Sequence, residues 1–330
     1  MTPHEASQDI VVRSGAWPAA ERAVKQVLLR YGIVIALLGI GAVLSIVSPH
    51  FLKARNFMNV LQQATTVGIV ALGMTFALTA GGVDLSVGSI VGLCGIIIAD
   101  VLVSGYGMVL AIPVGLALGA LCGCINGFLI TRANMPSFVA TLSTMITLRG
   151  ITMLYTGGIS IYPVKPEDSM VIAGQVAGIP KPILIAGLAA VVAHFLHKHS
   201  KLGHYATAIG GNEEAAFLSG IPVHKYKVMI WALSGLMAGL SALILTARLY
   251  AAEPMSGQGY ELDAIAATVI GGTSFSGGEG SVFGTVIGTL LISVLRNGLN
   301  LLNVNPYYHT IVVGAVIVIA VGLDKIRRNR

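Results

Sequence analysis

The stretch "GMVLAIPVGLALGALCGCINGFLIT", residues 107–131, contains no charged side chain. A helix rises 1.5 Å per residue, so about 20 apolar residues are enough to cross the hydrocarbon core of a bilayer. Runs of this kind recur along the whole chain. The sequence therefore predicts an all-α polytopic membrane protein.

Composition supports this fold class. Of the 330 residues, 55% are hydrophobic and 10% are charged, and the mean hydropathy is +0.83. Soluble domains carry about 25% charged residues, so most of this surface must face something other than water. We expect about ten transmembrane helices in a single domain, 31–330, after a polar tail, 1–30. The expected spans are 31–48, 60–80, 86–104, 107–131, 137–156, 181–199, 228–250, 260–275, 281–297 and 307–324.

The basic residues predict how the chain is oriented. If both termini lie inside, the interior segments hold 13 of the 20 lysines and arginines, and the exterior segments hold four. Cytoplasmic loops of membrane proteins carry such an excess. The net charge of +6 thus reflects topology and does not indicate nucleic-acid binding. We expect a multi-pass membrane protein with cytoplasmic N- and C-termini, and an exterior loop at 157–182 with short extended pieces.

Signatures of catalysis are missing from the sequence. It has no G-x-x-x-x-G-K-[ST] phosphate loop, and we find no pairing of a nucleophile with a base. Cys94, Cys122 and Cys124 lie in apolar runs, without a histidine or carboxylate close enough in sequence to suggest zinc, and we interpret them as packing residues. We expect no enzyme activity, metal or cofactor in this chain.

The segment "TAGGVDLSVGS", residues 79–89, places a carboxylate between two apolar runs. Such a group at membrane depth is costly unless it is paired or lines a cavity. Glycines beside Asp84 predict a broken helix, and two interpretations stay open. Either the polar groups here face a wet translocation pathway, or Asp84 caps the next span. The candidate pathway residues are Asp84, Ser86, Ser89, Asn126, Arg149 and Thr273.

Three arginines fall inside the predicted spans. Arg149 lies about eight residues from the exterior end of its span, so it can serve a pathway or subunit contact, or snorkel to the surface. Arg248 and Arg296 lie near span ends, where snorkelling is expected. Glu261 and Asp263 begin the 260–275 span, where the helix dipole favours acidic residues.

Two stretches of the chain are alike. "GGVDLSVGSIVG", residues 81–92, and "GGTSFSGGEGSVFG", residues 271–284, share the pattern GG-x-x-x-S-x-G. An Asn-Gly pair and then a proline follow each of them, at different spacings. Internal repeats are common in transporters, so the pattern hints at a duplication.

A charged stretch interrupts the apolar chain at "AIGGNEEAAFLSGIPVHKYK", residues 208–227. Asn212 suits an N-cap and Gly220 the position after a helix end, which predicts a helix of about seven residues. So short a helix is unstable alone and must be held by something. It can plug into another protein or lie on its own membrane domain. The candidate contact residues of this segment are Gly211, Asn212, Glu213, Glu214, Ala215, Ala216 and Gly220.

Five motifs in order resemble a known family, from about Tyr31 to the C-terminus. They are "GGVDLSVGS", "NMPSFVATLSTMITLRG", "AIGGNEEAAFLSGIPVHKYK", "GYELDAIAATVIGGTSFSGGEGS" and "NGLNLLNVNP". Together they resemble the permease subunit of bacterial monosaccharide ABC importers of the ribose, xylose and arabinose type. Glu214-Ala215-Ala216 with Gly220 resembles the E-A-A-x-x-x-G of importer coupling loops, here about 200–227. The I-x-L-P ending of the longer motif is missing after Ile230.

The resemblance implies a ten-helix importer permease core that acts with several partners. These are a cytoplasmic ABC ATPase that binds ATP and Mg²⁺, a periplasmic sugar-binding protein, a second permease copy or paralogue, the monosaccharide and membrane lipid. Two other classes are weighed beside it. A self-contained secondary transporter or facilitator needs ion-coupling carboxylates, for which Asp84 is the one good candidate. An intramembrane enzyme or scaffold lacks a catalytic constellation.

Overall fold

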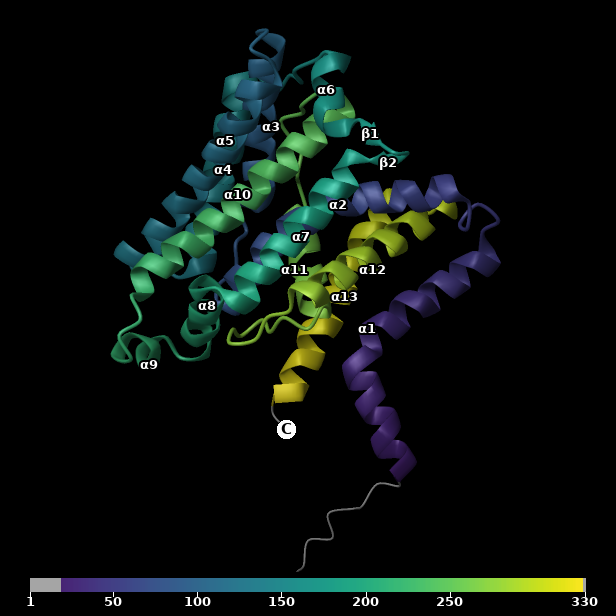
Figure 1. Cartoon of the computed structure of the whole chain (residues 1–330), viewed down its shortest axis with the longest axis vertical. Helices are drawn as coiled ribbons and strands as arrows, with labels where there is room; N and C mark the ends of the chain where they lie inside the picture. The colour runs from purple at the N-terminus through teal and green to yellow at the C-terminus, as the bar shows by residue number, and fades with distance from the viewer. Residues whose placement is uncertain (1–18, 329–330) are drawn as a thin grey trace, which may run out of the picture.

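The computed structural model describes residues 19–328, which form a bundle of α-helices (Figure 1). The first 18 residues of the predicted polar tail lie outside the described residues. The longer helices are α1 (Ala19–Val47), α2 (Ala54–Thr79), α3 (Val87–Val103), α4 (Gly107–Arg132), α5 (Ser137–Thr156), α7 (Lys181–His199), α10 (Val223–Leu249), α12 (Val282–Leu301) and α13 (Pro306–Arg328). The shorter ones are α6 (Pro166–Ala173), α8 (Lys201–Gly211), α9 (Glu213–Leu218) and α11 (Tyr260–Ile270).

Helix α10 lies at the centre of the bundle and packs against α4, α2 and α3. Its backbone approaches that of α4 closely, because glycines face each other there. A Cβ atom built on Gly123 would collide with the backbone of Trp231, and one built on Gly235 would lie 2.8 Å from the Gly123 nitrogen. Small residues allow such close approach between membrane helices.

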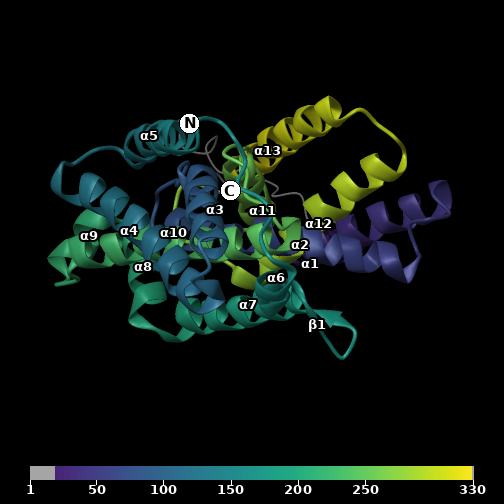
Figure 2. The same ribbon diagram turned by 90° about the horizontal axis from the view of Figure 1, so that it is seen from above.

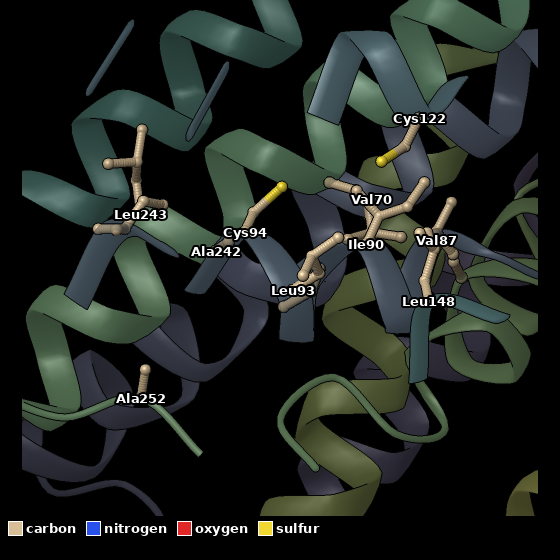
Figure 3. Close-up of a cluster of buried hydrophobic side chains, with 14 of the residues drawn as sticks. Val70, Val87, Ile90, Leu93, Cys94, Cys122, Leu148, Ala242, Leu243 and Ala252 are labelled. Carbon is tan, nitrogen blue, oxygen red and sulfur yellow. The ribbon is translucent and has the colours of Figure 1, made fainter. Parts of the chain in front are cut away.

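The main apolar cluster lies between α2, α3, α4 and α10 (Figure 3). Cys94 and Cys122 belong to it and are buried, which agrees with the packing interpretation of these residues. Within the described residues, no group of three or more His, Cys, Asp or Glu side chains is arranged to hold a metal ion.

Nine of the ten predicted spans correspond to apolar helices. Six of these are long and apolar enough to cross a membrane, and three shorter apolar helices are Gly32–Val47, Val87–Val103 and Tyr307–Ile319. The prediction of a full span at 260–275 is wrong. Helix α11 has 11 residues, or about 16 Å, roughly half the thickness of a hydrocarbon core.

Turns and loops flank this half-length helix at both ends. Before α11, the chain leaves α10 and pairs with the 157–182 loop, through the bridge Ile161↔Ala252 and the hydrogen bond from Val164 N to Tyr250 O. After α11, residues 271–281 reach the end of α2, where Gly278 N donates to Thr79 O at 2.9 Å. The 157–182 loop itself holds α6 and a two-stranded hairpin, β1 (Gln175–Val176) and β2 (Ile179–Pro180), so the prediction of short extended pieces is confirmed.

The bundle has two unlike ends. Helix α6 and the hairpin lie at one end, called here the α6 end, and α8 and α9 lie at the other, called the α9 end (Figure 1). Viewed from above, α5 and α13 stand on either side of a face on which α3 and α11 lie between them (Figure 2).

Candidate transport site

Asp84 lies in the break between α2 and α3, where residues 80–86 leave helical geometry. One carboxylate oxygen accepts from Ser86 N at 3.0 Å and from Ser86 Oγ at 2.6 Å. The other accepts from Ser234 Oγ, on α10, at 2.8 Å. The side chain is fully buried. Asp84 thus satisfies the backbone that enters α3, which agrees with the capping interpretation.

Asn126 extends this network from α4. Its amide donates to Ser86 Oγ at 2.7 Å, and Ser89 Oγ donates to Ser86 O at 2.8 Å. The Asn126 carbonyl oxygen is buried without a hydrogen-bond partner. Four of the predicted pathway residues therefore meet in one buried cluster. Ser234 was missed in the sequence, where only its setting in "LSGLMAG" marks a small polar group at a close helix contact.

Arg149 lies at a second break, which precedes α11. It is half-buried on α5, and its Nη1 donates to the carbonyl oxygens of Pro254 at 2.6 Å and Ser256 at 3.2 Å. Backbone groups outside a helix are tolerated at membrane depth only when protein or a water-filled cavity satisfies them. Arg149 provides hydrogen-bond donors for two of these backbone carbonyl groups. It therefore helps to fix the segment that leads into α11.

The other charged groups of this region form internal contacts. Arg296 Nη2 donates to Asp263 at 2.6 Å and Arg248 Nη1 to Gln62 O at 2.9 Å, so the expectation that both snorkel is wrong. Asp263 and Glu261 lie in the first turn of α11 as predicted, and Gly259 N donates to Glu261 at 3.2 Å. Thr273 is buried in the following loop, where its hydroxyl accepts from Ser281 N at 3.2 Å.

The two similar stretches of sequence meet in space. Gly277 lies against Gly81, and both lie against Gly210 near the end of α8. The loop after α11 therefore contacts the segment that leads directly into α9. This contact is a physical connection between the half-length helix and the α9 end.

Helix α9 has the caps that were predicted. Asn212 Oδ1 accepts from Ala215 N at 2.9 Å, and Gly220 has a φ of +82°, a conformation that costs glycine little. Gly211 is the last residue of α8. Lys227 Nζ and the Glu213 carboxylate are 2.8 Å apart.

The faces of α9 point in different directions. Ala216 is 5% exposed and packs with Ile209 and Val223, so it attaches the short helix to its own chain. Glu214 and Ala215 are exposed, and so are Phe217 and Leu218, at 59% and 78%. Large apolar side chains exposed at the bundle end favour contact with another protein.

A bundle of apolar helices with polar breaks at membrane depth is typical of a multi-pass membrane transport protein. The chain belongs to the family described as "branched-chain amino acid transport system / permease component", which matches residues 56–321. It is a transport subunit and not an enzyme.

The chain matches curated permeases along nearly their whole length. The ribose import permease protein RbsC of Bacillus subtilis (strain 168) is 46% identical over 301 residues, 91% of this chain and 94% of that protein. RbsC of Escherichia coli (strain K12) is 42% identical, covering 90% and 94%. The L-arabinose ABC transporter permease protein AraH of Azospirillum brasilense is 33% identical, covering 100% and 95%. No solved structure gives a significant match. These relatives support the importer interpretation and not the secondary transporter.

Proposed function

We propose that this chain is the permease subunit of an ABC importer that moves a monosaccharide across a bacterial inner membrane. The observation that carries the proposal is the 42–46% identity to ribose import permeases over 301 residues. A relative named for L-arabinose at 33% identity supports a monosaccharide substrate without selecting one sugar.

The chain acts in this proposal with partners that supply energy and substrate. A separate cytoplasmic ATPase binds ATP and Mg²⁺, and a periplasmic sugar-binding protein delivers the sugar. A second permease copy or paralogue completes the membrane part. The exposed face of α9, formed by Glu214, Ala215, Phe217 and Leu218, is the contact for the ATPase. Motion of the ATPase then reaches α11 through the contact of Gly210 with Gly277.

The translocation pathway remains a prediction. Asp84, Ser86, Ser89 and Asn126 are buried and bond to one another, so we assign them the task of fixing the break before α3. Arg149 is half-buried and fixes the second break. In this proposal the ten-crossing topology is kept, because residues 250–281 cross together as a segment of turns, the half-length helix α11 and a loop.

The proposed orientation places the α9 end in the cytoplasm. Ser219 and Glu167 are exposed at opposite ends of the bundle, so single cysteines can test it. In intact cells whose outer membrane has been made permeable, a membrane-impermeant thiol reagent should label Glu167→Cys and spare Ser219→Cys. The unaltered chain, with its own three cysteines, is the control for background. Labelling of Ser219→Cys from outside would contradict the orientation.

The function is tested by uptake into proteoliposomes that contain the permease, its ATPase and the sugar-binding protein. We expect ATP-dependent accumulation of at least one monosaccharide. Leu218→Asp should abolish it and reduce ATPase co-purification about tenfold or more, because an exposed apolar contact is replaced by a charge.

Val176→Asp is the matched control for co-purification. Val176 is an exposed apolar residue in the hairpin at the α6 end, so its variant should retain the ATPase. Uptake without ATP would indicate a facilitator. Normal ATPase retention by Leu218→Asp would show that α9 is not the coupling contact.

A further inference from the structure

An apolar groove of about 200 Å³ lies between α2, α7 and α12. Small residues line much of it, including Ala64, Gly68, Ala186, Gly187 and Ala190. Helices α7 and α12 contact each other beside α2. Gly187 is exposed and Ala186 and Ala190 are half-buried, so the groove opens on the outside of the bundle. In a multi-pass membrane protein, this surface faces acyl chains.

The wall of the groove on α7 leads to positive charge. Residues four apart lie on one face of a helix, and Ala186, Ala190, His194 and Lys198 follow each other at this spacing. His194 and Lys198 are exposed, and Lys201 is exposed at the start of α8. Lys198 and Lys201 form the cation cluster, which therefore lies beyond the groove, toward the α9 end.

The depth of the groove matches the reach of one lipid. From Gly187 to Lys198 the helix rises about 16 Å, which is close to half of the roughly 30 Å hydrocarbon core. Lys198 thus lies near the end of α7, about half a hydrocarbon core away from Gly187. The acidic residue Glu279 precedes Gly280, which lies against His197, so one carboxylate comes from a residue next to this end of α7.

We propose that the groove and the cation cluster bind one anionic phospholipid, with an acyl chain in the groove and its phosphate against Lys198 and Lys201. Charge selects an anionic lipid over a zwitterionic one. Basic pockets between transmembrane helices on the cytoplasmic side bind such head groups. A recess on the same helix face distinguishes this site from lysines that only follow the positive-inside rule.

Native mass spectrometry of the full-length permease in detergent tests the site. The probes are palmitoyl-oleoyl phosphatidylglycerol and phosphatidylcholine, which differ in the head group alone. We expect one phosphatidylglycerol per chain to be retained at concentrations where phosphatidylcholine is lost. Lys198→Gln should weaken phosphatidylglycerol binding about fivefold, and Lys198→Gln with Lys201→Gln about thirtyfold. Lys165→Gln, an exposed lysine at the α6 end, should leave binding unchanged.

A second variant tests the groove independently of charge. A Cβ atom on Gly187 would meet no atom within 4 Å, so Gly187→Leu can fill the groove without disturbing the fold. It should abolish retention of phosphatidylglycerol. Gly150→Leu on α5, where a Cβ atom is equally free, is the matched control and should bind normally. Both variants should melt like the unaltered protein.

Three results would overturn the proposal. They are equal retention of the two lipids, unchanged binding by the double lysine variant, and loss of binding in the lysine variants without loss in Gly187→Leu. The third result would mean that the lipid binds to surface charge alone and not in the groove. None of these readouts depends on sugar uptake, so a failure of the transport proposal would be seen separately.

Discussion

The two breaks in the bundle are stabilised in opposite ways. At the break before α3, the charged residue belongs to the broken segment itself, and Asp84 receives hydrogen bonds from three donors while fully buried. At the break before α11, the charged residue comes from a neighbouring helix. Arg149 is half-buried and donates to two backbone carbonyl groups.

This difference separates a more enclosed break from a less enclosed one. Every group around Asp84 is enclosed, so changing the bonding there requires donors to be left without partners in an apolar interior. Arg149 and Ser256 are half-buried while Pro254 is buried, so this break is less enclosed than the one at Asp84. We infer that the break before α3 is the more rigid of the two, and that the break before α11 is held less tightly.

The largest effect is expected from Asp84→Leu. The change leaves Ser86 N and Ser234 Oγ without their acceptor in a buried site. Each unsatisfied buried group costs about 1–3 kcal/mol, so we expect a loss of about 3–5 kcal/mol. That corresponds to a fall of about 10 °C in the melting temperature, measured by size-exclusion of the detergent-purified protein after heating.

Asp84→Asn is the matched variant for this comparison. Its carbonyl oxygen still accepts from Ser86, and its amide can donate to Ser234 Oγ, which as a hydroxyl can reverse its role. It should melt within a few degrees of the unaltered protein. A normal melting temperature for Asp84→Leu would show that these hydrogen bonds do not hold the break.

A smaller and local effect is expected from Arg149→Met. The carbonyl groups of Pro254 and Ser256 lose their donor, but Arg149 and Ser256 are only half-buried, which limits the cost to about 1–2 kcal/mol. Amide hydrogen exchange should rise in residues 250–259 and stay unchanged in α10. Arg149→Lys keeps one donor and should restore part of the protection. Unchanged exchange in Arg149→Met would remove the distinction between the two breaks.

Local sequence predicted most of the fold. The spans 137–156 and 181–199 match α5 and α7 residue for residue, because apolar runs end at polar or glycine residues there. The prediction of a span at 260–275 was wrong because "IGGTSF", residues 270–275, contains no charge and reads as the end of an apolar helix. The backbone in fact leaves the helix after Ile270. Apolarity shows that a segment is buried and does not show how its backbone runs.

Hydrogen-bond partners that lie far apart in the sequence could not be predicted from local sequence patterns. Asp84 and Ser234 lie 150 positions apart, and Arg149 and Pro254 lie 105 apart, so only the packing of α10 and the path of the 250–259 segment bring them together. Helix α9 was different. Its caps at Asn212 and Gly220 are local in sequence and were predicted correctly.

The smallest effect sharpens the comparison most, because it separates side-chain bonding from backbone bonding with two similar changes. Ser234→Ala deletes a hydroxyl that donates to Asp84, in a site with no access to water. It should lower stability by about 1 kcal/mol. Ser256→Ala deletes a hydroxyl beside the other break, but Arg149 bonds the Ser256 backbone carbonyl, which alanine keeps. Its stability should therefore not change. Melting temperatures of the two variants, measured side by side, show whether side-chain hydrogen bonds stabilise the break before α3 more than the break before α11. If both variants melt alike, the break before α3 does not depend on the side chains around Asp84, and its rigidity must come from helix packing alone.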